Sequence, residues 1–388
     1  MFRTFNNLSY MHKGQLPYQL ARSILLTPGP LSCDKSVKQA MMIDYGSRDK
    51  TFTNIVKMIR TKLLDIGDID KDKYTTILIP GSGTYGVESV ISSSIPKDGK
   101  LAVFSNGAYG IRMTQIAKAH NISFTHSKTN NNTSITAETI LNTLNESYNI
   151  THIAIVHHET TTGILNPIEE IADAVQGYNK ANDKNIILIV DAMSSYGGIP
   201  INFKNSNIDF LISSSNKCIE SVPGFSYVIA KKQSLDMTKG NERTVSLALY
   251  PQWKNMEESQ QFRFTPPTHS LVAFNCALDM LINEGGIAKR NIRYTKYNNL
   301  INTRMNQIGF KSYLEKDQGC IITTFRYPYD TFDFEKFYTL LAVDGIVIYP
   351  GKLSDEKVFR IGNIGSLSDD DIEHSLDVIE RVYTTHFK

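Results

Sequence analysis

Residues 208–219 read Ile-Asp-Phe-Leu-Ile-Ser-Ser-Ser-Asn-Lys-Cys-Ile and place one lysine directly after a short apolar run. The run from Phe210 to Ile212 predicts a buried strand that opens into a small polar loop ending at Lys217. A lysine in such a loop is either an exposed surface charge or an amine at the carboxyl edge of a sheet, where α/β folds bind ligands. Because lysines are mostly exposed, this stretch alone favours the surface charge. Other segments must decide between the two.

Strands and helices alternate around this loop. Apolar runs predict strands at residues 76–80, 101–104, 153–157, 186–190, 210–213 and 225–229. Helical patterns lie at 35–42, 54–64, 86–94, 112–120 and 168–178. This alternation predicts a mainly parallel sheet with helices on both faces.

After about Pro267 the pattern changes to long helices at 271–284 and 291–308, followed by shorter strands and helices. The sequence thus predicts an α/β fold in three segments. These are an N-terminal arm (1–23), a large domain (24–268) and a smaller α+β C-terminal domain (269–388).

Composition excludes several classes of protein. The 388 residues include 41 Lys+Arg and 39 Asp+Glu, a net charge of +2, so neither a nucleic acid nor a membrane surface is an expected partner. No apolar run approaches the ~20 residues of a membrane span. Four scattered cysteines without metal or redox spacing indicate reduced thiols and a cytoplasmic location. The N-terminus is basic and has no acid before Asp34, which leaves an organellar location as the alternative.

Gly81-Ser82-Gly83-Thr84-Tyr85-Gly86 matches G-x-G-x-x-G between a predicted strand and helix. A dinucleotide site would also need an acid about 20 residues later, and the next strand ends in Ser-Asn-Gly instead. The remaining reading is a helix N-terminus that binds one phosphate with the Ser82 and Thr84 hydroxyls. The alternative is a plain tight turn.

Asp191 directly follows the apolar run 186–190. Asp191 and Lys217 therefore stand at the carboxyl ends of consecutive predicted strands. No second carboxylate or histidine adjoins Asp191, and we expect no metal site. The pair suits pyridoxal phosphate, whose aldehyde a lysine holds as a Schiff base while an aspartate holds the pyridinium N–H. This pairing is the main indication of function.

Three further residues are candidates with ordinary alternatives. Tyr109, flanked by glycines, is either a ring for a planar ligand or a core tyrosine. The Thr160 hydroxyl is a candidate hydrogen-bond donor, whereas packing roles are expected for His157 and His158. Arg360 lies in an apolar run, where its charge needs a partner. That partner is either the carboxylate or phosphonate of a ligand, or an acidic side chain of the protein itself.

These segments together resemble the class V aminotransferases, a group of fold type I pyridoxal-phosphate enzymes. The resemblance runs from Leu25 almost to the C-terminus. It rests on residues 25–31 (Leu-Leu-Thr-Pro-Gly-Pro-Leu), 81–83, 105–110 (Ser-Asn-Gly-Ala-Tyr-Gly), 159–163 (Glu-Thr-Thr-Thr-Gly), 190–195 (Val-Asp-Ala-Met-Ser-Ser), 216–219 (Asn-Lys-Cys-Ile) and 359–365 (Phe-Arg-Ile-Gly-Asn-Ile-Gly). The last two are similar to the aminoethylphosphonate-specific branch of the group.

The resemblance implies a role for each matching residue. Lys217, next to Asn216, would bind the cofactor and move the proton, with Asp191 on the pyridine nitrogen and Tyr109 and Met193 on the two faces of the ring. It further implies that Ser82, Gly83 and Thr84 hold the phosphate, completed by Thr265 of a second subunit in a homodimer. Thr160 would contact the ring oxygen, and Arg360 would bind the acidic end of the substrate.

The reaction implied moves the amino group of 2-aminoethylphosphonate to pyruvate, giving phosphonoacetaldehyde and L-alanine in phosphonate catabolism. Alternatives are an alanine– or serine–glyoxylate aminotransferase, an NAD-dependent dehydrogenase, and a catalytically silent homologue. The chain departs from the family pattern at Glu220-Ser221, where Gln-Gly is common, and at Arg48, where an aromatic residue is expected.

Overall fold

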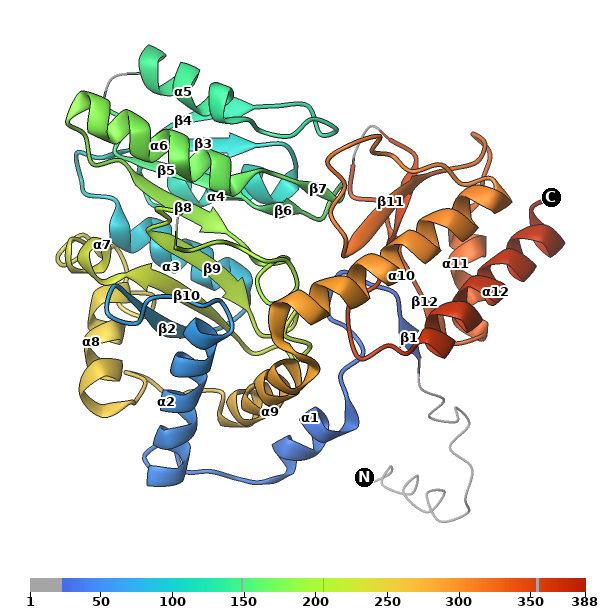
Figure 1. Ribbon diagram of the computed structural model, residues 1–388, viewed down its shortest axis with the longest axis horizontal. Coiled ribbons are helices and arrows are strands. Elements are labelled where there is room, and N and C mark those ends of the chain that lie inside the picture. The colour runs from blue at the N-terminus through green and yellow to red at the C-terminus, as the bar shows by residue number, and fades with distance from the viewer. Residues whose placement is uncertain (1–22, 148, 205, 354–355) are drawn as a thin grey trace, which may run out of the picture.

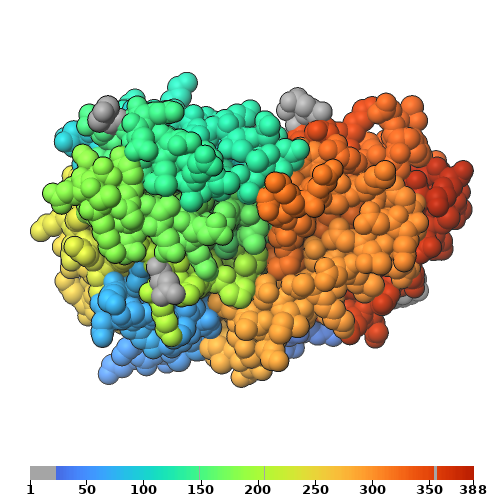
Figure 2. All heavy atoms as spheres, turned by 45° about the horizontal axis from the view of Figure 1, so that its top comes forward, coloured from blue at the N-terminus to red at the C-terminus, as the bar shows by residue number. Residues whose placement is uncertain are grey.

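The computed structural model describes residues 23–147, 149–204, 206–353 and 356–388. The arm predicted at residues 1–23 lies outside the described residues, apart from Ser23. Figure 1 shows a larger part built around a central sheet and a smaller part, coloured orange to red, that contains the C-terminus. In Figure 2 the orange residues pack directly against the green residues of the larger part.

A seven-stranded sheet forms the centre of the larger part, in the order β2-β10-β9-β8-β5-β3-β4. Its strands are β2 (Tyr74–Pro80), β3 (Lys100–Ser105), β4 (Ser123–Lys128), β5 (His152–Val156), β8 (Ile187–Asp191), β9 (Phe210–Ser214) and β10 (Phe225–Lys231). Neighbours are parallel except at β10, which runs antiparallel to both β2 and β9. The prediction of a mainly parallel sheet is confirmed. All strands but β10 therefore bring their carboxyl ends to one edge.

Helices cover both faces of this sheet. The main covering helices are α3 (Gly83–Ser94), α4 (Ala108–Ala119), α5 (Ala137–Glu146) and α6 (Ile168–Asn182). The chain steps one way across the sheet from β2 to β3 to β4 and the other way from β4 to β5 to β8. Right-handed crossovers then put α3 and α4 on one face and α5 and α6 on the other, as Figure 1 shows. Strands β5, β8 and β9 are accordingly buried throughout.

Further elements complete the larger part. They are α1 (Lys35–Gln39), the 3₁₀ turn η2 (Ala40–Met42), α2 (Lys50–Asp65), the hairpin β6 (His158–Glu159) and β7 (Ile164–Leu165), α7 (Lys232–Asp236), α8 (Leu249–Ser259) and α9 (Thr268–Glu284). Helix α2 buries Phe52, Val56 and Ile59 on one face. This face packs against β2 and α9.

The smaller part is an α+β unit. It contains α10 (Gly286–Ile308), β11 (Ile322–Arg326), α11 (Phe334–Val343), β12 (Ile346–Val347), β13 (Tyr349–Pro350), β14 (Val358–Gly362) and α12 (Asp369–His386). Strands β11, β14 and β13 form an antiparallel sheet in that order. Its core is aromatic, with the Phe310 and Phe359 rings 5.3 Å apart and edge-on. Ser368 begins α12 with a capping box that includes Asp371.

The packing crosses the predicted domain boundaries at two places. Strand β1 (Ile24–Leu25) pairs in parallel with β12, and Ile24 and Leu26 join the core of the smaller part. Helix α9 buries Leu271 and Phe274 in the core of the larger part. Residues 24–26 therefore belong with the smaller part and α9 with the larger one. Both depend on contacts between distant segments, which local patterns do not reveal.

Within the described residues, no single helix is long and apolar enough to cross a membrane. Helices α9 and α10 pass that test only as a pair, by length and composition, and the pair is bent by 82°.

Candidate active site

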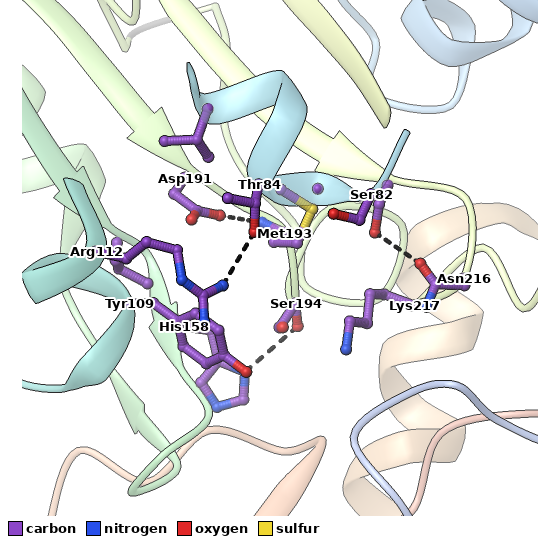
Figure 3. Close-up of a pocket in the computed structure, with 14 residues that line it drawn as sticks. Ser82, Thr84, Tyr109, Arg112, His158, Asp191, Met193, Ser194, Asn216 and Lys217 are labelled. Atoms are coloured by element: carbon purple, nitrogen blue, oxygen red, sulfur yellow. Dashed lines mark hydrogen bonds between the residues drawn. The ribbon is translucent and has the colours of Figure 1, made fainter. Parts of the chain in front are cut away.

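A cavity of about 250 Å³ opens at the carboxyl edge of the sheet. Side chains that follow β2, β3, β5, β8 and β9 converge on it, as Figure 3 shows. The lining residues are Ser82, Gly83, Thr84, Val87, Tyr109, Arg112, Val156, His158, Asp191, Met193, Ser194, Ser214, Asn216 and Lys217. The predicted parallel topology is what gathers these distant segments at one edge.

Lys217 lies in the turn between β9 and β10 and points into this cavity. Its Nζ donates to the carbonyl oxygens of Pro28 (2.6 Å) and Gly29 (3.2 Å). Burial is the main reason that the pKa of Lys217 is lowered to about 8, and the nearby charges of Arg360 and Lys352 contribute to that shift. Lys217 is therefore not the exposed surface charge that its own loop suggested. A buried amine with a lowered pKa is suited to act as a nucleophile or a base.

Asp191 ends β8 on the other side of the cavity. Its Oδ1 accepts a hydrogen bond from the backbone N–H of Met193 at 2.9 Å. Burial is the main reason that the pKa of Asp191 is raised to about 7, and the neighbouring charge of Glu159 contributes to that shift. A carboxylate this costly to ionise gains most from a cationic partner, such as a protonated ring nitrogen.

The N-terminus of α3 forms one wall of the cavity. Ser82 is its N-cap residue, and the Ser82 side chain makes no capping hydrogen bond, which leaves the first N–H groups for a ligand. Gly83 packs so closely on Met193 that a Cβ there would lie 2.2 Å from the Met193 sulfur. The glycine thus allows the helix terminus to approach the residues that follow β8.

Tyr109 is held in place by a buried acid that the sequence analysis did not single out. The carboxylate of Glu159 accepts hydrogen bonds from the backbone N–H groups of Tyr109 (3.0 Å) and Gly110 (3.4 Å) in the first turn of α4. The pKa of Glu159 is raised by its complete burial. Glu159 therefore caps α4 and fixes the backbone of Tyr109.

Two basic side chains approach the Tyr109 ring. The guanidinium carbon of Arg112 lies 4.9 Å and the Lys352 Nζ 4.4 Å from the ring centroid. Arg112 also donates to the Thr84 hydroxyl at 3.0 Å, which connects α4 with the N-terminus of α3. Positive charge is thus placed beside the candidate phosphate site.

Arg360 reaches the same region from β14 of the smaller part. Its Nη1 donates to the carbonyl oxygen of Thr160 at 3.1 Å, and its Nε donates to that of Pro350 at 3.0 Å. Arg360 is only 6% exposed. Within the described ranges, its guanidinium has no carboxylate oxygen within 4.0 Å, so the internal ion pair considered above is absent there.

Eight of the predicted site residues line the cavity together: Ser82, Gly83, Thr84, Tyr109, Asp191, Met193, Asn216 and Lys217. Thr160 is buried and contacts Arg360 next to them, through its backbone. Thr265 lies exposed in the loop between α8 and α9, and neither it nor the exposed Arg48 lines the cavity. Of the two histidines, His158 lines the cavity, and burial lowers its pKa to about 4.

Three residues of this region escaped the sequence analysis. Arg112 and Lys352 read as ordinary exposed charges, one on a helix and one in a loop. Glu159 was visible only as part of a motif. One signal was available in the sequence. Helix α4 follows Asn-Gly and has no acid in its first turn, so another segment must supply the group that caps it.

The donor set fits pyridoxal phosphate. The cavity offers a buried amine, a buried carboxylate across from it, a helix N-terminus with two hydroxyls, and a tyrosine ring. In the part of the chain that the structure describes, no group of three or more His, Cys, Asp or Glu residues could hold a metal ion.

Residues 39–366 match the family model described as aminotransferase class-V. The chain belongs to the class V aminotransferases. This aminotransferase is therefore a pyridoxal-phosphate-dependent enzyme, with the cavity at Lys217 as its candidate cofactor site.

Curated relatives of this aminotransferase match it over 92% of its length. A 2-aminoethylphosphonate–pyruvate transaminase of Bacillus cereus is 47% identical over 360 residues, covering 92% of this chain and 97% of the relative. One of Lysinibacillus sphaericus is 44% identical over 357 residues, covering 92% and 96%. A bifunctional phosphonoacetaldehyde hydrolase/aminoethylphosphonate transaminase of Clostridioides difficile is 46% identical over 361 residues, covering 92% of this chain and 56% of that protein.

Solved structures confirm the predicted fold. An alanine–glyoxylate aminotransferase from Nostoc sp. superposes with a TM-score of 0.85 at 23% identity, covering 98% of this chain and all of that one. A pyridoxamine–pyruvate aminotransferase from Mesorhizobium loti gives 0.84 at 22% identity, covering 95% and 94%. The aminotransferase has the fold type I architecture.

Proposed function

We propose that this aminotransferase moves the amino group of 2-aminoethylphosphonate to pyruvate, giving phosphonoacetaldehyde and L-alanine. The observation that carries the proposal is an excess of positive charge at the site. Arg112, Lys352 and Arg360 gather around the Lys217 amine, and among the described residues none of the three has a carboxylate within 4.0 Å. Two acids, Asp191 and Glu159, lie near them. Such a site favours a substrate that brings several negative charges of its own.

The names of the relatives support the same substrate. Transaminases of Bacillus cereus and Lysinibacillus sphaericus are named for 2-aminoethylphosphonate and pyruvate. The Clostridioides difficile relative carries phosphonoacetaldehyde hydrolase in its name as well. Phosphonoacetaldehyde is what 2-aminoethylphosphonate becomes when its amine is replaced by an aldehyde oxygen.

The position of each residue in the cavity indicates its role in the proposed reaction. Bound pyridoxal phosphate supplies the aldehyde that takes up the amine and a ring that stabilises negative charge on the adjacent carbon. Asp191 keeps the ring nitrogen protonated, and Tyr109 holds the ring plane. Ser82 and Thr84 bind the phosphate at the N-terminus of α3. Arg360 binds the phosphonate in one half-reaction and the carboxylate of pyruvate in the other, because a guanidinium fork fits both oxyanions.

Lys217 carries the proton transfer. Its Nζ lies in the cavity that would hold the cofactor, and its lowered pKa gives it a larger unprotonated fraction near neutral pH than an ordinary lysine has. The unprotonated Nζ takes the proton from the substrate carbon that bears the amino group. A base whose pKa lies close to the working pH is the effective kind.

A product assay tests this function. With 2-aminoethylphosphonate and pyruvate, we expect phosphonoacetaldehyde and alanine in equal amounts, detected by phosphorus and proton NMR. Activity with alanine or serine and glyoxylate, but none with the phosphonate, would move the enzyme to the alternative substrate class. The Lys217→Ala variant should lose activity by roughly a thousandfold or more while retaining its helical circular dichroism.

We also propose a homodimer in which Thr265 of one subunit completes the phosphate site of the other. Large apolar side chains exposed near Thr265 and α3 support it: Phe264 is 49%, Val245 72% and Tyr85 51% exposed. Arg263 joins two of these segments by donating to the Val245 carbonyl oxygen at 2.9 Å. Sedimentation at several concentrations tests it, and a strict monomer with full activity would remove Thr265 from the site.

A cytoplasmic location is proposed on the four free cysteines, which form no disulfide. Fractionation of cells that express the protein tests this, and recovery with an organelle fraction would contradict it.

A further inference from the structure

A buried cluster of charges lies beside the turn that carries Lys217, and nothing in the proposed reaction accounts for it. Arg290 and Arg293 project from α10 and bracket Glu284 at the end of α9, with Arg290 Nη2 2.6 Å and Arg293 Nε 2.8 Å from its carboxylate. The second acid is Glu220, three residues after Lys217. Arg290 is 2% and Glu220 7% exposed, so these charges are held away from water.

One carboxylate oxygen of Glu220 serves three donors. Its Oε1 accepts from the Tyr294 hydroxyl (2.6 Å), Arg293 Nη2 (2.9 Å) and the backbone N–H of Gly365 (3.2 Å). The backbone N–H of Glu220 also donates to the carbonyl oxygen of Lys217 at 2.8 Å, closing the turn. Glu220 adopts a φ of +61°, a conformation that a residue with a side chain rarely takes. These contacts therefore hold the turn in an otherwise unfavourable shape.

The two arginines of α10 bind segments on both sides of Glu220. On the side of Lys217, Arg290 Nη1 donates to the carbonyl oxygen of Cys218 at 2.7 Å. On the side of Arg360, Arg293 Nη1 donates to the carbonyl oxygen of Gly365 at 3.0 Å. Gly365 comes three residues after the end of β14, the strand that carries Arg360. A continuous set of hydrogen bonds thus connects the turn that carries Lys217 with the segment that follows the Arg360 strand.

We propose that Glu220 is a positioning residue that fixes the Lys217 turn relative to the strand carrying Arg360. It acts through the oxygen that it shares among Arg293, Tyr294 and Gly365. The amine and the guanidinium, which the proposed function places at opposite ends of one small substrate, then keep a constant separation. The inference rests on that proposed function for the roles of Lys217 and Arg360.

Two substitutions separate the position of this oxygen from the charge of Glu220. Glu220→Ala removes the acceptor, and we expect kcat to fall at least about tenfold and both KM values to rise, because small misplacements of reacting groups are costly. Glu220→Gln keeps an oxygen that can accept from Tyr294 and Gly365. It removes one of the two negative charges, so Arg290 and Arg293 then share only that of Glu284. It should unfold at a lower temperature, yet keep kcat and KM within about threefold of the wild type.

Arg304→Ala is the matched control, since Arg304 lies on the same helix α10. It binds Glu373, Asp377 and Glu380 of α12 rather than the two acids of the cluster beside Lys217. We expect it to lower stability without changing kcat or KM. A purely structural role for Glu220 would give its alanine variant the same behaviour as this control.

A second measurement needs no cofactor and no turnover. In the cofactor-free protein, the Lys217 Nζ is buried and bonded to Pro28 and Gly29. Acetic anhydride, with the modified peptide followed by mass spectrometry, should label Lys217 at least about threefold faster in Glu220→Ala because the turn loosens. Glu220→Gln and Arg304→Ala should label at the wild-type rate.

The inference is overturned if Glu220→Ala keeps wild-type kcat, KM and labelling rate, or if Glu220→Gln loses as much activity as Glu220→Ala. Lys217→Ala separates this failure from that of the function. If Lys217→Ala is inactive while Glu220→Ala is unchanged, only the positioning role is wrong. If Lys217→Ala remains active, the proposed function itself is wrong.

Discussion

At the scale of single residues, Arg360 and Lys352 offer a graded test of how the substrate anion is bound. Arg360 is buried and the proposed function assigns it to both substrates, so Arg360→Met should raise both KM values roughly 10- to 150-fold, the worth of a hydrogen bond to a charged group. Lys352 is exposed, and its charge should matter most for a phosphonate with two negative charges. Lys352→Met should therefore raise KM for 2-aminoethylphosphonate roughly three- to fivefold and KM for pyruvate less. Equal effects on the two substrates would contradict this role for Lys352.

Asp191 gives a prediction about stability and pH. Its pKa of about 7 in the folded chain exceeds the ordinary 3.8, so the folded state holds this proton more tightly than the unfolded state. The contribution of Asp191 to stability therefore falls as pH rises from about 4 to 7. Asp191→Asn lacks this pH dependence. In the cofactor-free protein, the free energy of unfolding of the variant minus that of the wild type should therefore increase by about 1–3 kcal/mol from pH 5 to pH 8.

Denaturant unfolding at the two pH values measures this difference. Asp98→Asn, which removes an exposed carboxylate of the same larger part, is the control. A difference between Asp191→Asn and the wild type that does not change with pH would show that Asp191 is not held in this costly state.

At the scale of elements, substitutions of two glycines, one at the start of a helix and one inside a helix, should have opposite effects on stability. A Cβ at Gly107 would lie 2.3 Å from the Glu159 Cγ, so Gly107→Ala must displace the acid that caps α4. We expect a loss of about 1–3 kcal/mol in unfolding free energy, together with weaker cofactor binding because Tyr109 moves. Gly177→Ala, inside α6 with no atom within 4 Å of its Cβ, should instead gain about 0.5–1 kcal/mol. Thermal unfolding compares the two variants, and a stable Gly107→Ala would contradict the capping role.

The elements also show where sequence patterns succeed and fail. Strands β5, β8 and β9 were predictable because they are buried on both faces and read as continuous apolar runs. Strand β4, Ser-Phe-Thr-His-Ser-Lys, was missed because it lies at the sheet edge and is largely polar and part-exposed. Helix α5 was missed as well, although its Thr136 cap and the buried Ile140 and Leu144 form a short amphipathic pattern.

The candidate site was predictable where one segment contains its own signal. A strand followed by Asp191, or by the loop with Lys217, shows its chemistry locally. Arg112, Lys352 and Glu220 gain their meaning only from the side chains that they meet across the fold. The Glu220-Ser221 departure was visible in the sequence, but the two arginines of α10 that meet Glu220 were not.

At the scale of the whole molecule, the cofactor site lies where the two parts meet. A ligand bound only by the folded state stabilises it, so pyridoxal phosphate at about 100 times its Kd should add about 2.7 kcal/mol to the free energy of unfolding. Lys217→Ala should show a smaller gain at the same concentration, because it loses the amine that holds the cofactor. Thermal unfolding with and without the cofactor measures both, and equal gains would place the cofactor elsewhere.

The most direct test of the central claim is the visible absorption of the purified enzyme with bound pyridoxal phosphate, titrated with 2-aminoethylphosphonate in the absence of pyruvate. We predict that the band falls with this amine, falls much less with alanine, serine or glycine at equal concentration, and returns when pyruvate is added. A band that responds only to alanine or serine would contradict the phosphonate as substrate. No band at all, even after incubation with pyridoxal phosphate, would contradict Lys217 as the residue that holds the cofactor.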